Sequence, residues 1–186
     1  LEAMQINENI EVSIKCRIGL GKEFNDDFFE DFIDEILKSS IKLGYIHARN
    51  AILKGISPKD NRNVAPLNYD FVSKIKSKYP DITFILNGGI DSIEEALELS
   101  KKHDGVMLGR LIQNNPFCLK DVDRLFYNET SKYIISEKTI NDYFSFIRPK
   151  IGKDSIYRLL SPLLNVFFGI PDSKQFTLDI QHTMHN

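Results

Sequence analysis

Two glycine-containing turns follow two apolar segments of the chain, and together they could bind a phosphate group. Asn87-Gly88-Gly89 comes directly after the segment 82–86, and Gly109-Arg110 comes after the segment 105–108. Glycine lets backbone N–H groups approach a phosphate closely, and an arginine can add a bidentate contact. Either turn alone could serve only to reverse the chain, but the two turns lie one strand–helix unit apart. We therefore predict a phosphate site formed by Asn87, Gly88, Gly89, Gly109 and Arg110.

Two basic side chains lie in short segments that have the composition of β-strands. Lys15 alternates with apolar neighbours in Val12–Cys16, and a lysine on a buried strand requires an anionic or polar partner. Its ammonium group suits an electron-rich ring or a carbonyl oxygen, and the alternative is an outward lysine in a salt bridge. His47 lies near the end of Tyr45–Ala48, where it is either a core residue or a ligand contact. We expect both side chains to contact a ligand.

A basic loop, Lys54–Arg62, contains the cations Lys54, Lys59 and Arg62. A loop at the active face of an enzyme is where a substrate with a phosphate backbone would make its first contact. The alternative is an ordinary solvated loop. The cysteines, Cys16 and Cys118, have neither the number nor the spacing of a disulfide framework or a zinc site, so we predict no metal site. We interpret Cys16 as a buried structural thiol.

Alternating strands and helices in the first two thirds of the chain predict a parallel sheet. We expect a helix from Asn25 or Asp26 to about Leu43, closed by Gly44, and further helices over Tyr69–Tyr79 and from Ser92. Polar and glycine residues at the ends of successive strands are typical of the (β/α)8 barrel. No strand is followed by GxGxxG, which disfavours the doubly wound alternative. A full barrel needs roughly 200 residues or more, so residues 1–119 would form about half of one.

The remaining residues, 120–186, show no strand alternation. Helical spacing predicts helices over Lys138–Ile151 and Asp154–Phe168, each ended or kinked by its proline, and a final polar helix toward Asn186. The predicted fold is therefore the C-terminal half of a (β/α)8 TIM barrel followed by a small all-α domain. The first residue is not methionine, and residues 1–9 have the pattern of a helix end that runs into a strand. We expect a fragment of a longer protein.

Composition restricts the class of protein. The net charge is −2 and 42% of the residues are hydrophobic, which is ordinary for a soluble globular protein and argues against a generic polyanion binder. No apolar run approaches the roughly 20 residues of a membrane span, and residues 1–10 do not resemble a signal peptide. We expect a cytoplasmic protein with no membrane partner.

A series of short motifs, in order and spacing, resembles the tRNA-dihydrouridine synthases, and is most similar to their DusA-like branch. The motifs are Val12–Gly19, Ile46–Arg49, Gly55–Lys59, Asn61-Arg62, Pro66–Tyr69, Asn87–Ile90, Asp104–Arg110 and Asn115-Pro116. The resemblance covers residues 1–126, and it continues more weakly through Ile156–Arg158 and Phe167–Pro171.

The resemblance implies a barrel that holds FMN at its C-terminal mouth, with NADPH as the reductant. Lys15 then matches the lysine at the flavin ring, and His47 matches the histidine at the cofactor. The two glycine turns match the phosphate-binding segments, and the matching tRNA contacts are Lys59, Arg62 and, in a helical tRNA-binding domain, Arg158. The implied reaction reduces a uridine of tRNA to 5,6-dihydrouridine, and the target base must leave its stack.

The chain departs from the family pattern at the general acid. The resemblance places that cysteine in the missing N-terminal half, Cys16 does not match it, and we assign no catalytic residue. The tail Thr177–Asn186 is also poorer in arginine than the family's usual C-terminus. We expect the full-length protein to be a monomer. We expect this chain alone to be inactive and to self-associate through its open strand edges.

Two alternatives remain open at this stage. One is another FMN-dependent TIM-barrel oxidoreductase of the dihydroorotate-dehydrogenase type, against which the basic loop and the helical tail argue. The other is a non-catalytic RNA-binding remnant of half a barrel.

Overall fold

The computed structural model describes residues 10–21, 23, 25–39, 41–130 and 137–185. The chain divides into two compact units. The first comprises the described residues up to Ile90 together with Glu94–Leu108, and the second comprises Asp91–Ile93 and the described residues from Gly109 onward. Each unit has its own hydrophobic core.

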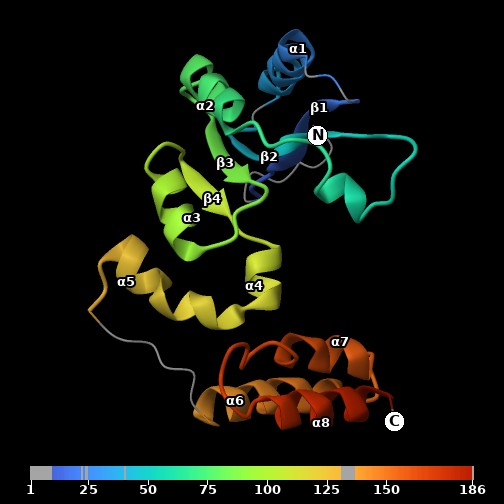
Figure 1. Cartoon of the computed structure of the whole chain (residues 1–186). Helices are drawn as coiled ribbons and strands as arrows, with labels where there is room; N and C mark the ends of the chain where they lie inside the picture. The colour runs from blue at the N-terminus through green and yellow to red at the C-terminus, as the bar shows by residue number, and fades with distance from the viewer. Residues whose placement is uncertain (1–9, 22, 24, 40, 131–136, 186) are drawn as a thin grey trace. The chain divides into compact units, whose positions relative to one another are not determined.

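The first unit contains a four-stranded parallel sheet in which the strands follow one another in sequence order (Figure 1). The strands are β1 (Ile14–Leu20), β2 (Leu43–Ala51), β3 (Thr83–Asn87) and β4 (Gly105–Met107). The helices α1 (Asp26–Leu37), α2 (Tyr69–Lys78) and α3 (Ile93–Ser100) alternate with them along the chain. The predicted α/β class with a parallel sheet is confirmed.

Asparagine caps begin α1 and α2, and the cap of α1 is at Asn25, one of the two residues that the sequence predicted. The side chain of Asn25 accepts a hydrogen bond from the backbone of Phe28 at 3.1 Å, and the side chain of Asn68 accepts one from Phe71 at 3.0 Å. Both helices pack their apolar faces on the sheet. The rings of Phe29 and Phe71 meet edge to face, with centroids 5.5 Å apart, in the core that covers one face of the strands.

The first two strands extend further than the sequence patterns predicted. Lys15 is the second residue of β1 and His47 is the middle residue of β2, so neither lies at the end of its strand. Gly19 belongs to β1 instead of opening a loop. The pairing of β1 with β2 continues to the end of both strands, with a register shift between Arg17 and Gly19. Pairing with a neighbouring strand therefore outweighs the low strand propensity of glycine.

The predicted end of the first helix is also wrong. Helix α1 ends at Leu37, where the hydroxyl of Ser39 donates to the backbone oxygen of Ile36 at 2.5 Å and turns the chain. Gly44 does not close this helix but lies buried in β2. A Cβ atom there would lie 3.2 Å from the ring of Phe84 on β3, so glycine at this position leaves room for the ring to pack against β2.

Helices account for the second unit, and its described residues contain no β-strand beyond an isolated bridge between Ile151 and Asp154. They are α4 (Arg110–Asn114), α5 (Val122–Tyr127), α6 (Glu137–Ile147), α7 (Ile156–Leu160) and α8 (Lys174–His185), with 3-10 turns between several of them. A core of Ile147, Leu159, Leu160, Leu163 and Ile180 joins the last three helices. Both α6 and α7 end ahead of a proline, Pro149 and Pro162, as predicted.

Candidate functional site

Predicted site residues gather on one face of the sheet in the first unit. The strand register pairs Arg17 with His47, His47 with Asn87, and Asn87 with Met107. Paired residues of neighbouring strands point to the same face, so these side chains form a row across the sheet. Lys15, two residues before Arg17, shares this face. The opposite face of the same strands packs against the core formed with α1 and α2.

Lys15 reaches across β2 to the third strand. Its Nζ donates to Oδ1 of Asn87 at 3.2 Å, and Nδ2 of Asn87 donates to the backbone oxygen of Met107 at 2.7 Å. The amide of Asn87 is thereby oriented by contacts on both of its polar atoms. Its partner is neutral, and among the described residues no carboxylate forms a salt bridge with Lys15. The positive charge of Lys15 favours an electron-rich ligand.

A side-chain-free turn follows Asn87 at the end of β3. Gly88 has a φ of 115° and Gly89 a φ of 70°, which glycine adopts far more readily than other residues. A Cβ atom at Gly88 would lie 3.1 Å from the ring of His47, and one at Gly89 would overlap Cδ1 of Leu67. The hydroxyl of Tyr69 donates to the backbone oxygen of Gly88 at 2.6 Å and fixes the turn. Gly88 is buried and Gly89 half-buried, and a glycine turn beside a lysine and an imidazole fits an anionic or aromatic ligand.

Gly109 and Arg110, the other predicted phosphate residues, belong to the second unit. Gly109 precedes α4, a five-residue helix, and Arg110 is its first residue. Both are exposed, and nothing lies within 4 Å of a Cβ atom built at Gly109. Local packing therefore does not explain this glycine, and its phosphate role stays a prediction.

Positive charge gathers at the basic loop. Lys59 and Arg62 are exposed at the two ends of the 3-10 turn η2 (Asp60–Arg62), Lys59 as the residue that precedes it. Burial lowers the pKa of the Arg17 guanidinium, and the charges of Arg49 and Arg62 lower the pKa further. Three guanidinium groups thus lie close enough to repel one another, which makes this part of the unit attractive to phosphate groups.

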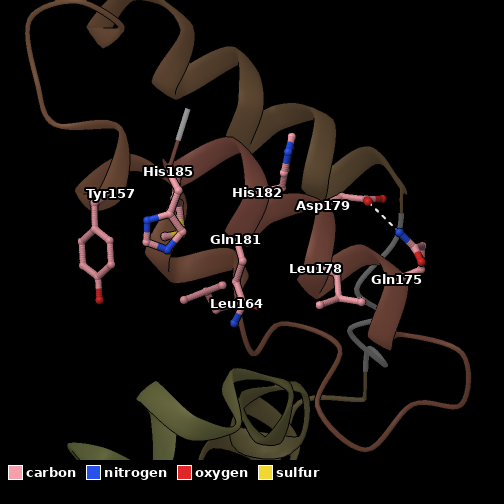
Figure 2. A pocket seen from close by; sticks show the side chains of 9 residues that line it. Tyr157, Leu164, Gln175, Leu178, Asp179, Gln181, His182 and His185 are labelled. Carbon is pink, nitrogen blue, oxygen red and sulfur yellow. Dashed lines mark hydrogen bonds between the residues drawn. The ribbon is translucent and has the colours of Figure 1, made fainter.

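Arg158 lies on α7 in the second unit, exposed, with Nη1 3.0 Å from the Asp154 carboxylate. Beside it, α7 and α8 border a pocket of about 730 Å³. Figure 2 shows the rings of Tyr157 and His185 among its lining side chains, and Nε2 of Gln175 donates to Oδ1 of Asp179 at 2.7 Å. Its lining is Tyr157, Leu164, Gln175, Leu178, Asp179, Gln181, His182, Met184 and His185, which includes no predicted site residue.

The thiol of Cys16 is unsuited to act as a nucleophile near neutral pH. The side chain packs against the core of the first unit, and burial raises its pKa to about 11, an effect that the nearby Lys15 partly opposes. A thiol with this pKa stays protonated and unreactive at pH 7. This agrees with the interpretation of Cys16 as a structural thiol.

Cys16 should accordingly resist alkylation. At pH 8 a free cysteine is roughly a quarter thiolate, whereas a pKa of about 11 leaves only about 0.1%. We expect iodoacetamide to label Cys16 in the folded Cys118→Ser variant roughly two-hundredfold more slowly than in urea, as measured by mass spectrometry. Equal rates in the folded and unfolded protein would contradict the burial of this thiol.

Three residues that position the site were not singled out in the sequence. Tyr69 and Leu67 hold the glycine turn, and Asn61 holds the basic loop. Their only signal was membership of the short motifs Pro66–Tyr69 and Asn61-Arg62, because their partners lie far away along the chain. In the described ranges, no group of three or more potential ligands could hold a metal ion, and no helix has the length and apolar character to span a membrane.

Comparison with known proteins identifies the relatives of this chain. The family model of the dihydrouridine synthases (Dus) matches residues 1–177. The chain belongs to the dihydrouridine synthase family. Members of this family are TIM barrels, and the parallel sheet of this Dus chain is consistent with that fold.

Curated relatives of this Dus chain include proteins of Yersinia pestis, Shewanella oneidensis and Salmonella typhimurium, each described as a tRNA-dihydrouridine(20/20a) synthase. They are 32%, 31% and 33% identical to it. The matches cover 100% of this chain but 54%, 56% and 56% of the relatives. The Dus chain thus spans about half the length of these relatives, and it matches their C-terminal half.

A solved structure of the Salmonella typhimurium RcsB response regulator aligns over 92% of each chain, with 11% identity and a TM-score of 0.32. A score this low does not indicate a shared fold.

Proposed function

We propose that the protein containing this Dus chain is a tRNA-dihydrouridine synthase. It would reduce a uridine of tRNA to 5,6-dihydrouridine with FMN as cofactor and NADPH as reductant. The observation that carries the proposal is the sheet face of Lys15, His47 and Asn87 beside the turn Gly88-Gly89, within a chain of this family. The names of the curated relatives support the same reaction.

We further propose that residues 1–119 form the C-terminal half of an FMN-binding TIM barrel and that residues 120–186 form a helical tRNA-binding domain. The sheet order supports the barrel half, and the helical core of α6, α7 and α8 supports the helical domain, while the second compact unit already begins at Gly109. In a barrel, the face that carries Lys15 and His47 would line the interior, and the face covered by α1 and α2 would be the outer one.

The residues of the sheet face suit a flavin. We assign Lys15 and His47 to the ring of FMN, and Asn87, Gly88, Gly89, Gly109 and Arg110 to its phosphate. When bound, FMN supplies the hydride for the 5,6 double bond of uridine and takes it in turn from NADPH. Asn87 holds the ammonium group of Lys15, which can stabilise negative charge on an electron-rich ring. Glycine at both positions of the turn lets a phosphate approach the backbone more closely than a side chain would allow.

The basic side chains outside this face would hold the substrate. We assign Lys59 and Arg62 of the basic loop, and Arg158 of α7, to backbone phosphates of tRNA, which fix the position of the RNA without selecting its sequence. The target base must leave its stack to reach the flavin. A proton must also reach the uracil, and Cys16 does not fit that role because its side chain packs against the core, on the sheet face opposite Lys15 and His47. We assign the proton donor to a part of the protein outside this chain.

One experiment separates this proposal from its alternatives. The intact purified protein is expected to show the visible absorption of bound flavin and to form dihydrouridine in an unmodified tRNA transcript when NADPH is added. Protein that stays colourless after incubation with FMN, yet binds tRNA, would instead indicate a non-catalytic RNA-binding protein. Flavin that is reoxidised by orotate but not by tRNA would indicate a small-molecule oxidoreductase.

A further inference from the structure

The side chain of Asn61 closes the basic loop into a ring. Its Oδ1 accepts a hydrogen bond from the backbone nitrogen of Ile52 at 3.0 Å, and its Nδ2 donates to the backbone oxygen of Ile52 at 2.6 Å. A carboxamide that pairs with both polar groups of one residue imitates a strand neighbour, and it joins the end of β2 to the far side of the loop. Asn61 itself is half-buried, whereas most of the loop is exposed.

Arg17 holds the same residue from the sheet. Its Nη1 lies 2.9 Å from the backbone oxygen of Asn61, 3.4 Å from its Oδ1 and 2.9 Å from the backbone oxygen of Asn50. The guanidinium therefore joins β1, the end of β2 and the loop. These acceptors are neutral, so the contacts orient the loop without cancelling the positive charge of Arg17.

The contacts of Asn61 extend to the cations on either side of it. Its backbone nitrogen donates to the oxygen of Ser57 at 2.9 Å, and the hydroxyl of Ser57 donates to the Asp60 carboxylate at 2.7 Å. The backbone nitrogen of Arg62 donates to the oxygen of Lys59 at 3.3 Å. Lys59 and Arg62 are thus presented on one short turn. Asn61 ties the middle of that turn to the sheet, and Arg49 of β2 donates to the backbone oxygen of Asn63, just after the turn, at 3.1 Å.

We propose that Asn61, held by Arg17, is the positioning residue that fixes Lys59 and Arg62 for contact with phosphate groups. This inference rests on the proposed tRNA contact of the loop. A loop that is ordered before binding loses less conformational entropy on binding than a mobile loop does, so its cations contribute more to affinity. Asn61 would then govern an electrostatic interaction although it carries no charge.

The first arm of the test follows the loop without RNA, by amide hydrogen exchange of the intact protein. In Asn61→Ala we expect the amides of Asn61, Arg62 and Val64 to exchange at least about tenfold faster, because two hydrogen bonds that anchor the turn are lost. Val64→Ala is the matched control, since it is a neutral change at an exposed residue of the same loop and should leave these rates unchanged. Unchanged rates in Asn61→Ala would overturn the inference.

The second arm measures how the dissociation constant for tRNA depends on salt. Lys59→Ala and Arg62→Ala should each reduce the slope of log K against log salt by roughly one unit. Asn61→Ala removes no charge, yet we expect it to reduce the slope by one to two units. Adding it to the Lys59→Ala/Arg62→Ala double variant should have no further effect, which general destabilisation would not reproduce.

The outcomes of the two arms are distinguishable. A slope in Asn61→Ala equal to that of the unaltered protein, together with reduced slopes in both cation variants, would overturn the inference. Normal slopes in the cation variants would contradict the proposed tRNA contact, while faster exchange would still support Asn61 as the residue that holds the loop. If Asn61→Ala does not fold, the neutral Asn61→Ser decides by the same two measurements, because its hydroxyl cannot pair with both polar groups of Ile52.

Discussion

Replacing Phe84 by alanine is expected to lower the free energy of unfolding of the first unit by about 3–5 kcal/mol. Phe84 is only 2% exposed, and its ring lies over Gly44 within the core that joins the sheet to α1 and α2. Loss of this ring removes apolar surface from the core and leaves a cavity, because glycine on the neighbouring strand offers no side chain to fill it. Domain stabilities are about 5–15 kcal/mol, so the effect would be a large share of the total.

Denaturant unfolding of the intact protein, followed by circular dichroism, measures this change. Thr83→Ala is the matched control, because Thr83 is exposed and adjacent on the same strand, and its loss should cost less than about 0.5 kcal/mol. A midpoint shift in Phe84→Ala equivalent to less than about 1 kcal/mol would mean that the core closes around the missing ring.

Replacing Gly89 by alanine is expected to lower the affinity of the intact protein for FMN. The φ of 70° at this position costs an alanine about 1–2 kcal/mol, and the added methyl group would overlap Leu67. A turn that changes its conformation to avoid the strained φ and the overlap with Leu67 must return to the original conformation to bind the phosphate, and that return costs free energy. That strain alone corresponds to roughly a fivefold to thirtyfold loss of FMN affinity, and the overlap adds to it.

Flavin affinity can be measured by fluorescence titration of the intact apoprotein. Gly152→Ala is a suitable control, because Gly152 also has a positive φ, of 81°, but nothing lies within 4 Å of its added methyl group. The double variant Gly89→Ala/Leu67→Ala should recover part of the affinity, since it relieves the overlap and not the backbone strain. Unaltered FMN affinity in Gly89→Ala would remove this turn from the proposed phosphate site.

The sequence predicted the parallel sheet and its covering helices because their signals are local. The cap at Asn25, the helical spacing of apolar residues around Phe29 and around Phe71, and the apolar segment ahead of Asn87 each report on a few neighbouring residues. The extents of β1 and β2 could not be predicted in the same way. Arg17 and Gly19 are unfavourable in an isolated strand, and only pairing with β2 keeps them in the sheet.

The candidate site was likewise predictable only where its signals are local. The types and spacing of Lys15, His47 and the glycine turn indicated a ligand site, and the structure brings these three together on one sheet face. The contact of Lys15 with Asn87 and the anchoring of the loop by Asn61 depend on residues distant along the chain. No local pattern reports such contacts, because a side chain that binds a remote backbone group has the same sequence signal as one that faces solvent.

The strand order affects how the first unit can fold during its synthesis. Each strand of the sheet pairs with the strand that precedes it in the chain, with a single helix-containing connection between them. During synthesis the chain emerges from the ribosome in the same order, so every new strand finds its partner already available. The sheet can therefore grow by one strand at a time, at a lower contact order than a sheet whose adjacent strands come from distant parts of the chain.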